Sequence, residues 1–195
     1  MADKEMPQVE PTPSARAATT VVTCEVTDVP VIVSAYDWGT LGHVVDVGGG
    51  DGTLVIALLN EYATLRGTVV ELPEPAEAAR KLLAAAGVAD RGQAVAGDFF
   101  GPLPTGAEGY LLCSVLQQWS DEEARTILRN CATAAGEDGA VFVIEKLADA
   151  RALASADRLR TRDVGQLTVL AENAGLAVSA VHTADEIAIL ELSTP

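Results

Sequence analysis

Short apolar runs alternate with amphipathic stretches of helical period from residue 41 to the end of the chain. Strands are expected at 43–47, 67–72, 93–97, 110–116 and 140–145, and helices at 53–63, 74–86, 121–135 and 164–174. Ser120 and Glu123 have the spacing of a capping box, which is typical of a helix N-terminus. Two apolar runs at 176–181 and 186–192 are close enough to form a hairpin across a four-residue turn. The pattern predicts an α/β fold: a mostly parallel sheet with helices on both faces and an antiparallel strand at its end.

The first part of the chain departs from this alternation. Residues 1–20 are rich in proline, serine, threonine and charged side chains, which is typical of a flexible leader. Residues 20–35 are rich in β-branched side chains, which favours extended structure that is interrupted at Pro30, with a helix as the alternative. The sequence therefore predicts a leader and remnant segment at 1–35, followed by one domain at 36–195.

A cluster of glycines follows the strand expected at 43–47, where the sequence reads Gly-Gly-Gly-Asp-Gly over 48–52 and a helix begins directly afterwards. Glycine has no Cβ, so the backbone can turn sharply and approach a ligand closely, and the helix N-terminus offers free N–H groups. Glu71 ends the next strand, where an acidic side chain accepts hydrogen bonds from ribose hydroxyls. The combination predicts a nucleotide-like ligand; the alternative is a tight strand–helix turn that binds nothing.

The spacing of the glycines narrows the class of ligand. Dinucleotide-binding proteins carry Gly-x-Gly-x-x-Gly, whereas this sequence has Gly-x-Gly-x-Gly, with Thr53 at the last position of the dinucleotide spacing. The phosphate-binding pattern Gly-x-x-x-x-Gly-Lys-Ser/Thr does not occur in the sequence. A ligand that carries adenosine and a carboxylate but no pyrophosphate fits this turn, and we therefore predict S-adenosylmethionine.

Composition excludes several functions. The 28 acidic residues outnumber the 13 basic ones and give a net charge of −15, which argues against binding to nucleic acid or to an anionic membrane. Hydrophobic residues make up 49% of the chain, enough for a core, yet no apolar run is long enough to cross a membrane. The polar N-terminal residues lack the pattern of a signal peptide, and the cysteines lack the spacing of a metal site. We expect a cytoplasmic protein without a metal.

Residues 36–146 resemble the cofactor domain of the small-molecule O-methyltransferases, the caffeate and anthracycline type that acts on phenols and polyketides. The matching stretches within these residues read YDW at 36–38, VVDVGGGDGTL at 44–54, VELP at 70–73, GDFF at 97–100, WSDEEAR at 119–125 and VIEK at 143–146. LTVLAENAGL at 167–176 and the final hairpin also match. The resemblance implies a Rossmann-like methyltransferase fold with a seven-stranded, mostly parallel sheet. It also implies a small aromatic substrate, a role in antibiotic or other aromatic polyketide biosynthesis, and S-adenosylmethionine or S-adenosylhomocysteine as the cofactor.

The resemblance also implies which residues contact the cofactor. Gly48 and Gly50 would lie beside its amino-acid end, and Glu71 would bind its ribose. Ser114 would lie near the methionine portion. These roles are expected from the positions that match the family, one residue at a time.

The adenine side of the site is implied in the same way. Asp98 would accept a hydrogen bond from the exocyclic amine of adenine, and Phe99 would form an apolar wall. Trp119 would lie near the adenine as well. The alternative for residues 98–100 is a turn at the end of a strand with two core aromatics.

One matching motif departs from the family at the residue that matters most for catalysis. The family has His-Asp-Trp where this sequence reads Gln117-Gln118-Trp119, and the family histidine is the general base. A glutamine amide does not accept a proton near neutral pH, so Gln117 cannot replace it. Glu145 matches the carboxylate that orients the histidine; we expect either a remaining catalytic role or, as the favoured alternative, a solvated carboxylate at a strand end. His43 and His182 fall outside the motif, and we expect them to be structural or solvated.

Three functions follow from these matches and departures. Family members carry an N-terminal helical domain that the residues before 36 do not resemble, and the stretch at 147–165 is short. The first function is an O-methyltransferase whose phenol loses its proton by other means, and the second is a repurposed member that uses the cofactor in another tailoring step. The third is a non-catalytic subunit of a partner enzyme from the same pathway. We favour a methyltransferase-like protein that binds S-adenosylmethionine and has little conventional activity.

Overall fold

The computed structural model describes residues 27–147 and 160–195, and its centre is a seven-stranded sheet in the order β3-β2-β1-β4-β5-β7-β6. The strands are β1 (His43–Val47), β2 (Arg66–Glu71), β3 (Gly92–Ala96), β4 (Gly109–Cys113), β5 (Ala140–Lys146), β6 (Ala177–Ala184) and β7 (Ile187–Ser193). Strands β1 to β5 pair in parallel, and β7 runs antiparallel between β5 and β6. The predicted mostly parallel seven-stranded sheet with a C-terminal antiparallel hairpin is confirmed.

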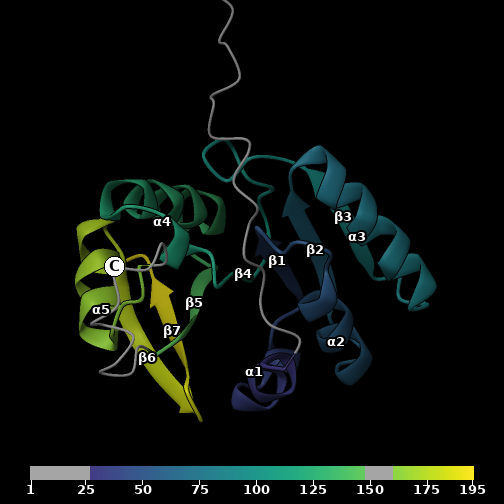
Figure 1. Ribbon diagram of the computed structural model, residues 1–195, viewed down its shortest axis with the longest axis horizontal. Helices are drawn as coiled ribbons and strands as arrows, with labels where there is room; N and C mark the ends of the chain where they lie inside the picture. Colours follow the sequence, from purple (N-terminus) through teal and green to yellow (C-terminus); the bar gives the residue numbers. More distant parts are fainter. Residues whose placement is uncertain (1–26, 148–159) are drawn as a thin grey trace, which may run out of the picture.

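Helices cover both faces of this sheet. They are α1 (Val29–Ala35), α2 (Thr53–Glu61), α3 (Pro73–Ala85), α4 (Asp121–Ala135) and α5 (Val164–Asn173). Apolar side chains of α1, α2 and α3 form one core with one face of the sheet, and those of α4 and α5 form a second core on the opposite face. Figure 1 shows α2 and α3 on one side of the strands and α4 and α5 on the other. Helix α4 begins with the predicted capping box, in which Ser120 and Glu123 exchange hydrogen bonds.

The favoured extended structure for residues 20–35 is wrong over 29–35, where the helical alternative is correct and the chain forms α1. Pro30 lies in the first turn of this helix, where its missing N–H costs no hydrogen bond. Val29 and Ile32 are buried in the domain core, and the Ile32 carbonyl accepts a 2.9 Å hydrogen bond from the indole N–H of Trp38. Burial therefore outweighs the β-branched composition, and the folded domain begins before residue 36. Residues 1–26, which include the whole flexible leader predicted at 1–20, lie outside the described residues.

Two predicted strand ends also differ from the structure. Strand β4 ends at Cys113, and Ser114 then takes a left-handed conformation with φ of 58°. The closing hairpin has two residues between its strands rather than four, because β6 extends to Ala184 and Asp185 adopts φ of 50°. Aspartate tolerates this conformation better than most side chains, which permits the tight turn.

The carboxyl ends of the parallel strands lie at one edge of the sheet, and this arrangement positions the candidate site. Gly48 directly follows β1, Glu71 ends β2, Ser114 directly follows β4, and Glu145 lies one residue before the end of β5. In open α/β sheets, ligands bind in the crevice outside these carboxyl ends. Among the described residues, no helix is long and apolar enough to cross a membrane.

Candidate functional site

The glycine turn after β1 has a backbone conformation that other residues adopt poorly. Gly48, Gly50 and Gly52 have φ values of 76°, 58° and 82°, respectively, all in the left-handed region. Gly49 is required for a different reason: a Cβ at this position would lie 2.4 Å from Oδ2 of Asp46. The turn therefore presents bare backbone at the edge of the sheet, which suits close approach by the amino-acid end of the predicted cofactor.

Glu71 lies directly beside this turn, as the sequence predicts. Its carboxylate is 2% exposed and accepts hydrogen bonds from the N–H groups of Leu72, at 2.7 Å, and Gly50, at 3.3 Å. An acidic side chain and a glycine turn thus meet at the ends of two neighbouring parallel strands. Each carboxylate oxygen can accept more than one hydrogen bond, so Glu71 retains the capacity to accept from a ribose hydroxyl.

Asp46 is a buried carboxyl beneath the glycine turn that the sequence analysis did not single out. It is 1% exposed, and Oδ1 has no hydrogen-bond partner within residues 27–147 and 160–195. Burial, reinforced by the neighbouring Glu71 and Asp51 carboxylates, raises the pKa of Asp46 to about 7. The signal that could have identified it is an aspartate inside an otherwise apolar strand, since a buried carboxyl is rare without a partner.

The adenine side of the predicted site is an aromatic cluster. Trp119 lies edge-on to Phe99 and Phe100, with ring centroids 5.6 and 4.9 Å away, respectively. The indole Nε1 of Trp119 is buried and has no hydrogen-bond partner in the described part of the chain. Asp98 accepts a 2.9 Å hydrogen bond from the backbone N–H of Phe100. This hydrogen bond belongs to a turn at the end of the strand. The contact between Asp98 and the adenine stays a prediction.

The predicted base position holds an amide that is already engaged. Gln117 is 8% exposed, and its Nε2 lies 3.4 Å from the carbonyl oxygen of Ser114. Gln118 donates to the same carbonyl at 3.0 Å. Both amides therefore pack against the left-handed Ser114, where this backbone conformation turns the chain out of β4. Within these described contacts, no group at residues 114–118 can accept a proton from a phenol near neutral pH.

Glu145 is buried, so the favoured expectation of a solvated carboxylate is wrong. It is 4% exposed, and Oε1 accepts hydrogen bonds from the N–H groups of Leu116, at 3.0 Å, and Gln117, at 3.4 Å. Burial raises the pKa of Glu145 to about 8, although these two donors and the Arg162 guanidinium act in the opposite direction. The Glu145 side chain therefore holds the backbone segment that carries Gln117. It has no histidine to orient, because position 117 is a glutamine.

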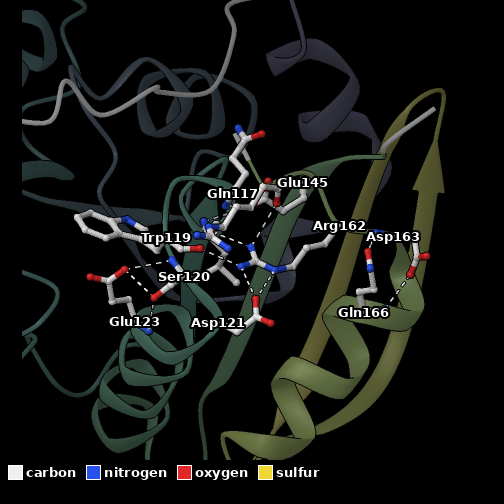
Figure 2. Close-up of polar contacts among 11 residues, drawn as sticks. Gln117, Trp119, Ser120, Asp121, Glu123, Glu145, Arg162, Asp163 and Gln166 are labelled. Carbon is white, nitrogen blue, oxygen red and sulfur yellow. Dashed lines mark hydrogen bonds and ion pairs between the residues drawn. The ribbon is translucent and has the colours of Figure 1, made fainter. Parts of the chain in front are cut away.

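Arg162 contacts the same segment from the other side, and the sequence analysis missed it. The guanidinium donates to the carbonyl oxygens of Leu116, at 2.8 Å, and Trp119, at 2.9 Å. It also donates to Oδ1 of Asp121 from Nη2, at 2.8 Å, and from Nε, at 3.2 Å, which lowers the pKa of Asp121. Figure 2 shows these contacts converging on Arg162. No local pattern could have revealed them, because its partners lie far away in the sequence.

The two histidines stand apart from these groups. His43 begins β1, and its Nε2 lies 2.8 Å from the hydroxyl of Thr68. Burial lowers the pKa of His43. The ring of His182 on β6 packs edge-on against Tyr36, with centroids 5.3 Å apart. Among the residues that the structure describes, no group of three or more His, Cys, Asp or Glu side chains could hold a metal ion.

Comparisons with known proteins agree with this geometry. The chain is 47% identical over 170 residues to the 2,7-dihydroxy-5-methyl-1-naphthoate 7-O-methyltransferase of Streptomyces carzinostaticus, which covers 83% of this chain and 51% of that protein. It is 44% identical over 164 residues to the aclacinomycin 10-hydroxylase of Streptomyces purpurascens, which covers 76% of this chain and 43% of that protein. The chain thus spans about half the length of the curated relatives it matches.

A solved structure supports the same assignment. An O-methyltransferase from neocarzinostatin biosynthesis, in complex with S-adenosylmethionine and 2-hydroxy-5-methyl naphthoic acid, matches with a TM-score of 0.78 at 46% identity. The match covers 84% of this chain and 52% of that one. Its bound cofactor is the one that the sequence predicts, and the same enzyme is also solved with S-adenosylhomocysteine. The sequence pattern of the O-methyltransferase domain family matches residues 17–188 of this chain. On fold, sequence and site geometry together, the chain belongs to the O-methyltransferase family.

Proposed function

We propose that this chain binds S-adenosylmethionine and S-adenosylhomocysteine at the carboxyl edge of β1, β2 and β4, and serves natural-product biosynthesis on a small aromatic substrate. The observation that carries the proposal is the meeting of two groups: the glycine turn at 48–50 and the buried Glu71, whose Oε2 lies 3.3 Å from the N–H of Gly50. The bare backbone at Gly49, where a side chain would collide with Asp46, fits the same ligand.

The chain's own residues divide the binding work between them. The turn at 48–50 accommodates the amino-acid end of the cofactor without side chains, and Glu71 accepts hydrogen bonds from ribose hydroxyls. Phe99 and Trp119 enclose the adenine, because an aromatic ring offers a large apolar face to a base. When bound, S-adenosylmethionine supplies an electrophilic methyl group.

Proton removal from the acceptor is the step for which this chain is poorly equipped. Gln117 cannot take the proton, and Glu145 is buried with a raised pKa of about 8, so its carboxyl holds its own proton near neutral pH. A general base contributes about 10²–10⁴-fold to rate. Methyl transfer by this chain therefore depends on positioning and on a phenol acidic enough to ionise unaided.

A repurposed tailoring step is the second candidate function, and one observation favours it. A relative with 44% identity is named a hydroxylase, so this family includes reactions other than methyl transfer. The glutamine at the base position fits a site in which methyl transfer is no longer the reaction. A partner protein from the same pathway stays a prediction.

Calorimetric titration with S-adenosylmethionine and S-adenosylhomocysteine tests the cofactor proposal. We expect micromolar affinity, about −8 kcal/mol. Glu71→Ala should weaken binding by about 1–3 kcal/mol, because a charge-assisted contact is lost. Glu77→Ala, on the exposed surface of α3, is the control and should bind like the wild type. Glu71→Gln, checked by circular dichroism, separates lost contact from lost folding. No binding at millimolar ligand, or affinity that ignores Glu71, would refute the proposal.

An activity assay of Gln117→His tests the argument from the missing base. We expect slow methyl transfer by the wild-type chain to 2,7-dihydroxy-5-methyl-1-naphthoate, the acceptor in the name of the relative with 47% identity, and a faster reaction by the variant, since histidine can accept the phenol proton. Gln118→His, one residue away, is the matched control. Brisk turnover by the wild type that Gln117→His leaves unchanged would overturn the argument.

A further inference from the structure

The segment from Leu116 to Asp121 links β4 to α4 and carries both Gln117 and Trp119. It is held by buried groups on two sides. On one side, Glu145 accepts hydrogen bonds from the backbone N–H groups of Leu116 and Gln117. On the other side, residues 160–162 donate to carbonyl oxygens of the segment, so its backbone polar groups are satisfied from both directions.

The donors at 160–162 contact carbonyl groups spread along the segment. The backbone N–H of Arg160 donates to Gln117 at 2.6 Å, and the Arg162 guanidinium donates to Leu116 at 2.8 Å and to Trp119 at 2.9 Å. The guanidinium then reaches the N-terminus of α4 through Asp121. Its side chain is 7% exposed, so its hydrogen bonds to the two carbonyl groups are shielded from bulk water, whereas the side chain of Asp121 is 72% exposed.

We propose that Arg162 is a positioning residue that holds the Leu116–Asp121 segment, and through it Trp119, in the geometry that the cofactor site requires. Its effect on cofactor affinity rests on the function proposed above, whereas its effect on Trp119 does not. Arg162 acts through the backbone carbonyl groups that it binds and not through contact with the ligand.

The chemistry of arginine explains why this position needs a planar fork. A guanidinium presents five N–H donors in a fixed plane, so one side chain can bind two carbonyls and a carboxylate together. A lysine ammonium is a point charge on a flexible stem, and it cannot reproduce that arrangement. Removing the guanidinium leaves the Trp119 carbonyl without this donor, while the Leu116 carbonyl keeps the N–H of Trp119 at 3.1 Å. A carbonyl left unsatisfied away from water costs more than the net contribution of the hydrogen bond itself.

Loss of the Arg162 hydrogen bonds would also affect the aromatic cluster of Phe99, Phe100 and Trp119. The Trp119 carbonyl is bound by Arg162, while the Trp119 ring lies edge-on against Phe99 and Phe100. A segment released at its carbonyl can shift the ring, and the wall predicted for the adenine then opens. Arg162 therefore couples the start of α5 to the adenine side of the site, across the connection that precedes α4.

A groove beside Arg162 makes this proposal testable by chemical rescue. The groove has a volume of about 640 Å³, lies between α4 and α5, and is lined by Arg162 together with Asp121 and Arg125. A small cation can therefore enter the space that a truncated side chain leaves. Guanidinium matches the lost group in charge and plane, whereas tetramethylammonium matches only the charge.

The experiment uses the full chain with 5-fluorotryptophan, because the chain has two tryptophans and each gives its own ¹⁹F resonance. Trp38 is fully buried in the other core and serves as the internal reference. We expect Arg162→Lys and Arg162→Ala to shift or broaden the Trp119 resonance and to leave that of Trp38 in place. Arg129→Ala is the matched control: it removes a guanidinium bond from α4 to the carbonyl of Asn173, away from the segment.

Rescue and ligand affinity complete the test. Guanidinium, at concentrations far below those that unfold proteins, should restore the Trp119 resonance of Arg162→Ala, and tetramethylammonium should not. Affinity for S-adenosylhomocysteine should fall about tenfold in Arg162→Lys, as loss of charged hydrogen bonds predicts. A Trp119 resonance that stays unchanged in both variants, or that moves together with Trp38, overturns the proposal. A chain that binds no cofactor refutes the proposed function but leaves the resonance test intact.

Discussion

Two buried carboxyls mark two regions of the same sheet edge, and they are stabilised in opposite ways. Asp46, below the glycine turn, has an oxygen without a partner in the described residues, and its carboxylate neighbours are Glu71 and Asp51. Glu145, at the end of β5, accepts two backbone N–H groups and lies in the field of Arg162. Burial raises both pKa values, but only the second carboxyl is compensated by donors and opposite charge.

The difference teaches how each region is specified. Around Asp46 the turn is fixed by glycines within a few residues, and Glu71, which accepts a hydrogen bond from Gly50, ends the neighbouring parallel strand. Around Glu145 the geometry is assembled from β5, from the segment after β4 and from Arg162 just before α5. The first region is specified by a short glycine motif and the end of the next strand. The second region depends on contacts between three parts of the chain that are far apart in sequence.

The largest expected effect is a pH dependence that originates at Asp46. Its pKa is about 7 in the folded chain, against an ordinary value of 3.8, so the folded chain keeps a proton that the unfolded chain releases. Stability that is fully present below about pH 4 is therefore lost as pH rises to about 7. Asp46→Asn should avoid that loss, and its free energy of unfolding relative to wild type should rise by about 2–4 kcal/mol across this range.

Urea unfolding of wild type and variant at several pH values measures this difference. Glu77→Gln is the control, because Glu77 is exposed and its hydrogen bond with Arg80 lowers its pKa, so any effect has the opposite sign. A difference between wild type and Asp46→Asn that does not change with pH would mean that the pKa of Asp46 is not raised in the folded chain.

A side chain at Gly49 should have the next largest effect. Gly49→Ala places a Cβ against the carboxylate of Asp46, which is buried and cannot move away, and we expect a loss of about 2–3 kcal/mol. Gly165→Ala is the comparison: like Gly49, Gly165 lies outside the left-handed region, and a Cβ there would lie 3.3 Å from the Asp163 carboxylate rather than 2.4 Å from a buried one. Equal changes in thermal or urea unfolding would show that crowding at Asp46 contributes nothing.

The same contrast decides what the sequence could predict. The strands, the helices and the pairing of Gly50 with Glu71 follow from periodicity and from a glycine motif that is followed, 21 residues after Gly50, by an acidic residue at the end of the next strand. Helix α1 was the less favoured alternative for its residues, because the sequence pattern does not show the burial of Val29 and Ile32 that outweighs β-branched composition. Arg162 was missed because its role depends on contacts with Leu116, Trp119 and Asp121, which no spacing in the sequence announces.

Removal of the Glu145 carboxyl should separate its two contributions. Glu145→Ala leaves the N–H groups of Leu116 and Gln117 without an acceptor, and we expect a loss of about 1–3 kcal/mol in urea unfolding. Glu145→Gln retains an oxygen that can accept both hydrogen bonds, so most of that loss should be recovered at pH 6. At pH 6 the Glu145 carboxyl, with a pKa of about 8, is protonated and uncharged, so the amide variant removes no charge. If that variant is as unstable as the alanine variant, the acceptor role of Glu145 does not account for the loss, and the comparison with Asp46 weakens.

The smallest effect on stability is expected at Ser114, where the backbone is left-handed without a glycine. Ser114→Gly relieves about 1 kcal/mol of backbone strain but raises the entropy of the unfolded chain by a similar amount, so the net change should be within about 0.5 kcal/mol. Asp185 in the hairpin, with φ of 50°, is the matched position outside the site, and Asp185→Gly should be equally neutral.

Ser114→Gly and Asp185→Gly should differ only in ligand binding. Ser114 is the residue whose carbonyl holds the Gln117 and Gln118 amides, and greater freedom there should weaken affinity for S-adenosylhomocysteine severalfold, with Asp185→Gly unchanged. Calorimetry on both variants checks this. Equal affinities would mean that the left-handed turn only redirects the chain, and that the second region needs Arg162 and Glu145 but not Ser114.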